Sequence, residues 1–176
     1  MSARRQAHGV SLLELVGVVI IVAILIGAAL DRLLPLVGRA QRAAFLDVRR
    51  ELQSALLLEA AERIARGQSA TLPELAAANP MTLLLTPPAN YVGALARPRP
   101  EEVPPASWYF DDASKTLVYR VGRHTRFTPK DGPDRLIELR VAFVFDDRDA
   151  DGVFDAVRDG FGGLRLEPVH AYDWPD

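Results

Sequence analysis

The sequence contains no cysteine, and this absence removes several classes of protein at once. Without thiols the chain has no disulfide scaffold, no thiolate zinc site and no cysteine nucleophile. It also lacks an excess of one charge, because 21 Lys and Arg stand against 23 Asp and Glu and the net charge is −2. General nucleic-acid binding, which requires a basic face, is therefore not expected.

Motifs of the common enzyme classes are missing as well. The three histidines, His8, His124 and His170, are scattered, and no spacing of Ser, His and Asp singles out a nucleophile with its base. The sequence has no phosphate-binding G-x-x-x-x-G-K-[ST] loop and no H-E-x-x-H zinc motif. We therefore expect a protein that is not an enzyme and requires no cofactor. A membrane-tethered hydrolase would lack a recognisable site.

Apolar residues are concentrated near the N-terminus. Residues 15–30 carry no charge, and only Ser11 and Glu14 interrupt the apolar run of residues 10–30. A helix of that length rises about 30 Å, which matches the hydrocarbon core of a bilayer. The alternative is a secretory signal peptide cleaved near residues 27–29. Because Asp31 and a further helical pattern follow without a polar break, we favour a retained membrane helix.

Glu14 is the one acidic residue within this apolar segment. A carboxylate in a membrane helix costs roughly 2–3 kcal/mol, so it is expected to have a partner or to reach the headgroups. Cleavage after Gly9 would create a partner, since the α-amino group of Val10 would lie one helical turn from Glu14. Arg4 and Arg5 precede the segment and favour a cytoplasmic N-terminus, whereas three arginines that follow it oppose this orientation.

The N-terminal sequence RRQAHG, followed by VSLLEL and the apolar run, resembles the prepilin leader of type IV pilins and type II secretion pseudopilins. The resemblance implies cleavage between Gly9 and Val10 by prepilin peptidase and N-methylation of Val10. It implies that Glu14 aligns an incoming subunit against the amine of its neighbour. The implied location is the bacterial inner membrane, with a single pass, a cytoplasmic N-terminus and a periplasmic head, and then a periplasmic or surface filament.

The helical period continues beyond the apolar run, through residues 31–66. An apolar stripe recurs every three or four residues, and the opposite face carries acid-to-base pairs such as Glu59–Arg63. Pro35 is expected to kink this helix, and Gly67 to end it. The stripe consists of Phe45, Val48, Leu52, Leu56, Ala60 and Ile64.

Residues 67–176 are expected to form a globular head. Thr71–Glu74 resembles a capping box that opens a short helix, and the proline-rich residues 86–105 predict a surface loop. Residues 108–110 and 117–121 predict a hairpin, residues 135–145 a strand, and residues 164–169 an edge strand. The fold class is α+β: a long helix packed against an antiparallel sheet of about four strands, as in pilin-like heads. The aromatic hairpin resembles that of MSHA-type pilin-like proteins.

The head also contains a possible calcium loop. The pattern D-x-D-x-D-G places three carboxylates around a turn, and the positions that follow add a carbonyl and another acid. The position of the closing bidentate acid is occupied by Arg158, so a solvated acidic turn is the alternative. The candidate Ca²⁺ ligands are Asp147, Asp149, Asp151 and Asp155.

Together these features predict a minor pilin or pseudopilin that is assembled through its N-terminal helix. Its expected partners are other pilin or pseudopilin subunits, prepilin peptidase and an inner-membrane assembly platform. The expected domains are a leader at 1–9, a filament-core helix at 10–30, an amphipathic continuation at 31–66 and a head at 67–176. A pilus, a secretion pseudopilus and a DNA-uptake filament all fit. The alternative is a single-pass anchored binding or adhesive module that does not polymerise.

Overall fold

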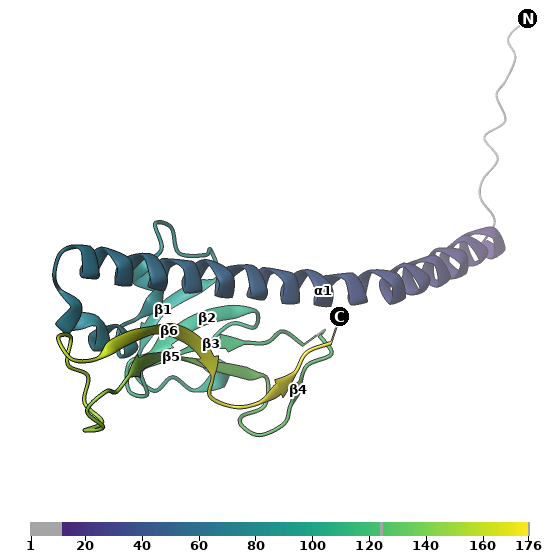
Figure 1. Ribbon diagram of the computed structural model, residues 1–176. Helices are drawn as coiled ribbons and strands as arrows, with labels where there is room; N and C mark the ends of the chain where they lie inside the picture. Colours follow the sequence, from purple (N-terminus) through teal and green to yellow (C-terminus); the bar gives the residue numbers. More distant parts are fainter. Residues whose placement is uncertain (1–11, 124, 176) are drawn as a thin grey trace, which may run out of the picture.

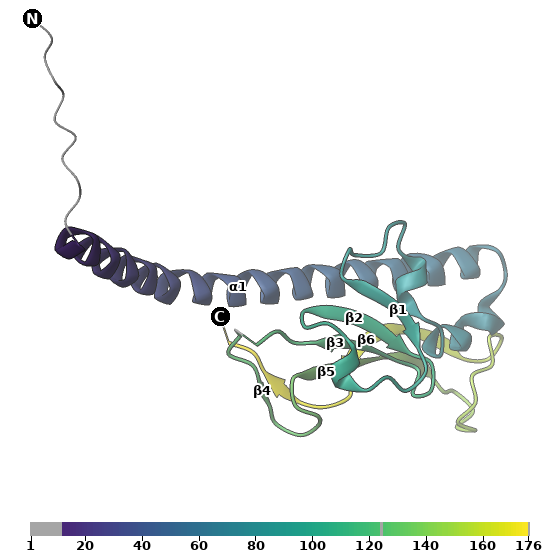
Figure 2. The same ribbon diagram turned by 180° about the vertical axis from the view of Figure 1, so that it is seen from behind.

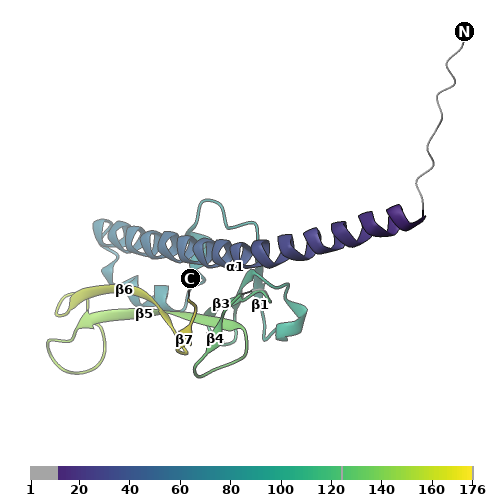
Figure 3. The same ribbon diagram turned by 90° about the vertical axis from the view of Figure 1, so that its right-hand side faces the viewer.

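The computed structural model describes residues 12–123 and 125–175 and has two layers, a single long helix and a sheet (Figures 1 and 3). Helix α1 spans Leu12–Ala65 without interruption. Its C-terminal half lies over the sheet, whereas its N-terminal half extends beyond the head (Figure 1). The helix continues through position 35, and its axis curves gently toward the N-terminal end instead of breaking.

Helix α1 ends as the sequence predicts. Gly67 adopts a φ of 72°, a left-handed conformation that glycine tolerates at little cost. The N–H of Gly67 donates to the carbonyl of Ile64, and the N–H of Gln68 donates to that of Arg63. These two bonds satisfy carbonyls at the end of the helix and reverse the chain toward the head.

The main sheet has five strands in the order β1-β2-β3-β5-β6. The α+β class is confirmed, but the sheet is mixed rather than purely antiparallel, since β1 runs parallel to β2 while the other neighbours are antiparallel. A second, two-stranded sheet pairs β4 with β7. The strands are β1 Tyr91–Leu95, β2 Ser107–Asp111, β3 Thr116–Arg120, β4 Thr128–Pro129, β5 Leu136–Asp146, β6 Gly160–Pro168 and β7 Tyr172–Asp173.

Strand β1 corrects the expectation of a surface loop over residues 86–105. Tyr91–Leu95 is a proline-free stretch between two prolines, and the carbonyl of Asn90 accepts a hydrogen bond from the N–H of Trp108 in β2. Gly93, with a φ of 118°, lies where the register shifts. The remainder of the segment forms the short 3₁₀ helix η3, Pro100–Glu102, and leads to Val103, which covers the sheet face opposite α1.

Two further predictions need correction. The short helix after α1 is the 3₁₀ helix η1, Ser69–Ala76, followed by η2, Pro80–Leu83. No capping box forms at Thr71, because its hydroxyl donates to the carbonyl of Gln68 and Glu74 faces Arg63 at 3.6 Å. The last long strand, β6, begins at Gly160 rather than at residue 164, but its position at the edge of the sheet is confirmed.

The core lies between α1 and the sheet, and aromatic rings form its centre. Phe45 of α1 stacks on Trp108 of β2, with ring centroids 5.1 Å apart, and also contacts Tyr119 and Trp174. Of the predicted stripe, Val48 is half-buried and Ile64 is exposed, since the helix runs past the core at its end. The buried members are Phe45, Leu52, Leu56 and Ala60.

Candidate functional site

The N-terminal half of α1 presents a long apolar surface to solvent. Its first 19 residues, Leu12–Leu30, are long and apolar enough to cross a membrane, and no part of this span is buried by the rest of the described chain. Large apolar surfaces of this kind do not remain in water and are covered by lipid or by protein. This half of the helix is therefore compatible with a single-pass membrane anchor.

Glu14 lies in the first turn of α1, and its side chain is exposed on this apolar surface. An acidic residue at that position interacts favourably with the positive end of the helix dipole. The other two residues of the predicted processing and assembly site, Gly9 and Val10, lie outside the described residues. The pairing of Glu14 with an amine therefore stays a prediction.

The C-terminal half of α1 is attached to the head by side-chain hydrogen bonds as well as by apolar packing. Gln53 donates from its Nε2 to the carbonyl of Leu164 at 2.7 Å and accepts from the N–H of Leu166 at 2.9 Å. Arg49 donates to the carbonyl of Leu166 at 3.2 Å, and Gln41 donates to the Tyr119 hydroxyl at 3.0 Å. The free edge of β6 is thereby partly paired by the helix.

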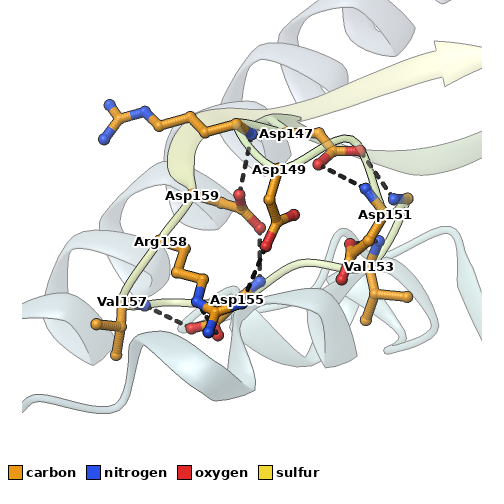
Figure 4. Close-up of polar contacts among 10 residues, drawn as sticks. Asp147, Asp149, Asp151, Val153, Asp155, Val157, Arg158 and Asp159 are labelled. Carbon is orange, nitrogen blue, oxygen red and sulfur yellow. Dashed lines mark hydrogen bonds and ion pairs between the residues drawn. The ribbon is translucent and has the colours of Figure 1, made fainter.

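The acidic loop, residues 147–159, connects β5 to β6 at the end of the head farthest from the N-terminal half of α1 (Figure 2). Carboxylate oxygens of Asp147, Asp149 and Asp151 lie within 4.8 Å of one another. The two oxygens of Asp147 accept from the N–H groups of Asp151 and Gly152, which folds the turn around this carboxylate (Figure 4). Three of the predicted calcium ligands thus converge.

Asp155, the fourth predicted ligand, is not part of this cluster. One of its carboxylate oxygens accepts from the N–H of Val157 at 2.8 Å. Arg158 lies between the two groups: its guanidinium is 3.2 Å from Asp149 and 3.9 Å from Asp155 (Figure 4). The oxygen ligands suit a hard cation such as Ca²⁺, but Arg158 already neutralises part of their charge.

Asp159 is a structural member of the loop that the sequence pattern does not reveal. It is buried, and its two oxygens accept from the N–H groups of Arg148 and Asp155 at 3.1 and 2.7 Å. A carboxylate that ties two backbone segments together orders the loop without any metal. The only sequence signal for this role is that Asp159 follows the pattern one residue too late for the closing ligand.

Titratable groups with shifted pKa values are tyrosines and one aspartate of the core strands and of β7. Burial, together with the negative charges of Glu138 and Asp111, raises the pKa of Tyr109 to about 12. Burial also raises the pKa values of Tyr119 and Tyr172. Burial alone would raise the pKa of Asp111, but hydrogen bonds from the N–H groups of Ala113 and Arg97 lower it. The tyrosine shifts therefore reflect burial in the head, and the Asp111 shift reflects the hydrogen bonds that its carboxylate accepts.

The chain matches no protein-family model, no curated protein and no solved structure.

Proposed function

We propose that the protein is a structural subunit, a minor pilin or pseudopilin, of a type IV pilus or type II secretion-like filament. The observation that carries this proposal is the division of α1 into two halves. In one half Leu52, Leu56 and Ala60 are buried against the head, and in the other half the whole Leu12–Leu30 surface is exposed. Such a helix has one permanent partner, its own head, and a second partner that the described chain does not supply.

A filament subunit requires two successive partners for this surface, first lipid and then the same segment of neighbouring copies. The prepilin-like motif at residues 4–15 supports this sequence of events, because removal of a leader at residues 1–9 would leave an amine close to Glu14. An ion pair between this amine and the Glu14 carboxylate of a neighbouring copy would offset the free-energy cost of placing a carboxylate among apolar helices. The pairing would also fix the axial register between neighbours.

The test is substitution of Glu14 by Ala or Leu in the full-length protein, expressed with its own assembly machinery. We expect both variants to remain in the membrane, because the apolar span is unchanged or longer, and to be absent from sheared or sedimented filaments. Glu51→Ala serves as the matched control, since Glu51 is an exposed acidic residue farther along the same helix. It should enter filaments at the wild-type level.

The competing hypothesis, a single-pass anchored binding or adhesive module that does not polymerise, makes the opposite prediction. In that case Glu14→Ala would behave as the wild type does, and neither protein would be found in a filament fraction. This result would overturn the proposed function.

A further inference from the structure

A groove of about 520 Å³ lies at the neck, where α1 leaves the head. Val37, Ala40 and Ala44 of α1 line one wall, and Pro105, Ala106 and Tyr119 line the other. The small helical side chains leave room between the helix and the end of the sheet. The floor of this neck groove is therefore apolar and open to a ligand or to a protein segment.

The rim of the neck groove is positively charged. Arg123 lines it, and Arg39, the neighbour of the lining residue Ala40 on α1, is exposed. Among the described residues, Arg39 and Arg123 take part in no ion pair, so both charges are available to a partner. An apolar floor with a polar, charged rim is the usual composition of a protein interface.

The acidic loop at the opposite end of the head has the complementary composition. Residues 147–159 contain five Asp and two Arg. Two valines lie among these charges with 93% (Val157) and 66% (Val153) of their surface exposed. Both side chains point away from the polar contacts at the centre of the loop (Figure 4). The loop thus offers apolar tips among carboxylates, which match an apolar groove that has Arg123 at its rim.

We propose that the acidic loop of one copy docks into the neck groove of a second copy, with Val157 on the apolar floor and Asp carboxylates against Arg123. This inference rests on the proposed function and names the contact between heads in the filament. The two surfaces are different, because residues of α1, of β3 and near Pro105 line the groove, whereas the other surface is the connection between β5 and β6. The contact is therefore heterologous, and each added copy leaves one free loop and one free groove.

The geometry also fixes when this contact forms. Ala40 lines the groove, whereas the acidic loop lies at the end of the head where α1 ends (Figure 1), and α1 ends at Ala65, 25 residues farther along the helix. At 1.5 Å per residue, the two copies are displaced by about 37 Å along the helix axis. A bilayer core is only about 30 Å thick, so a displacement of about 37 Å moves the apolar span of one copy out of the bilayer that holds the other. Two copies that both span the same membrane therefore cannot make the contact. It forms when one copy has been lifted out.

The absence of cysteine allows a direct test by crosslinking in the full-length protein. The double variant Ala40→Cys/Val157→Cys carries one thiol in the neck groove and one on the acidic loop. Treatment of its filaments with a short bis-maleimide should give a ladder of multimers, because every copy can link to two others. Each single variant should give no ladder. The pair Val92→Cys/Val157→Cys is the matched control, since Val92 is an exposed valine on β1, outside the groove.

Charge reversal provides the second measurement. Arg123→Glu in the double-cysteine background should reduce the multimer yield about tenfold, because it places a like charge against the loop. Arg97→Glu, at an exposed arginine outside the groove, should leave the yield unchanged. All of the substituted positions are on the surface, so thermal melting of the variants should match that of the wild type.

Three results would overturn the inference. Filaments that assemble but give no ladder would show that the heads meet elsewhere, and would leave the proposed function intact. If phosphatidylglycerol vesicles shield Ala40→Cys from an impermeant maleimide while filaments do not, the groove binds lipid instead. If the Glu14→Ala variant of the double-cysteine protein still gave a ladder although it formed no filament, the contact between heads would not be a contact of the assembled filament. A wild-type protein that never forms filaments removes the proposed function itself.

Discussion

Tyr109 lies on the face of the sheet opposite α1, in a small cluster with Val103, Val118 and Leu136. Its pKa of about 12, raised by burial and by the negative charges of Glu138 and Asp111, lies above the value of 10 in the unfolded chain. The folded state therefore holds this proton between pH 10 and pH 12, where the unfolded state has lost it. Stability from this group is fully present below pH 10 and is lost as the pH rises toward 12.

We expect the Tyr109→Phe variant to lose less stability than the wild type between pH 10 and pH 12. The difference should be about 2 kcal/mol, because the full linkage value of a shift from 10 to 12 is reached only above pH 12. Urea unfolding of the full-length protein in detergent, at a series of pH values, measures it. Equal losses in both proteins would mean that Tyr109 titrates normally in the folded head.

Arg158 decides how well the acidic loop can hold a cation. Its guanidinium lies against Asp149 and close to Asp155, and it occupies the position from which a twelve-residue calcium loop supplies its closing acid. We expect Ca²⁺ to bind the wild type only weakly. Arg158→Glu should raise the affinity at least about tenfold, because it removes a competing cation and adds a carboxylate. Isothermal titration calorimetry measures both values.

Arg148→Glu is the control for this experiment. It changes the charge of the same loop by the same amount, but Arg148 pairs with Asp146, outside the cluster of three carboxylates. A similar gain in affinity for both variants would indicate a general charge effect rather than a calcium site.

At the scale of elements, Gln53 joins α1 to β6. Its amide group both donates to and accepts from the outer edge of the strand, as a neighbouring strand would. An unprotected strand edge is a site for aggregation or for strand addition. Gln53 therefore anchors the helix and also covers part of this edge.

We expect Gln53→Leu to destabilise the head by about 1–3 kcal/mol, because two half-buried backbone groups lose their partner. The measurement is the free energy of unfolding in urea. Ser54→Ala is the control at the next position, where the exposed hydroxyl bonds only to the carbonyl of Arg50 in the same helix. It should stay within about 0.5 kcal/mol of the wild type. Equal effects of the two substitutions would assign no role to the Gln53 contacts.

The elements with strong local patterns could be predicted from the sequence. The two halves of α1 follow from hydrophobic periodicity, its end from Gly67, and β2, β3 and β5 from alternation between turns. Strand β1 could not be predicted, because it lies in a proline-rich segment and exists through its parallel pairing with β2. Pairing between distant segments leaves no local period.

The acidic loop and the neck groove differ in the same way: the loop is one contiguous segment, whereas the groove is formed by segments that are distant in the sequence. The aspartates of the acidic loop are contiguous, so their convergence could be predicted, although the intervention of Arg158 between Asp149 and Asp155 could not. The neck groove combines α1 with residues near 105 and 120, three segments that are far apart in the sequence. Its only local signal is the helical spacing of the small residues Ala40 and Ala44, and this does not show which other segments complete the groove.

At the scale of the whole molecule, the N-terminal mass separates the remaining hypotheses. In protein purified from its own membranes we expect a chain that begins at N-methylated Val10. A start at Met1 or Ser2 would contradict processing by prepilin peptidase and would leave a tethered head. A start near residue 30 would indicate export as a soluble protein, against both a filament subunit and an anchored module. Intact-mass spectrometry distinguishes the three starts.

The continuity of α1 determines how the head responds to mechanical force. A pull on Leu12–Leu30 travels along one unbroken helix and reaches the head at Gln41, Arg49 and Gln53. Their hydrogen bonds to Tyr119, Leu164 and Leu166 cross from the helix to the sheet, so axial tension loads them in shear. Bonds loaded in parallel must break together, whereas bonds that are peeled apart break one by one. We therefore expect the head to resist tension along the axis of α1 better than an equal force directed away from that axis.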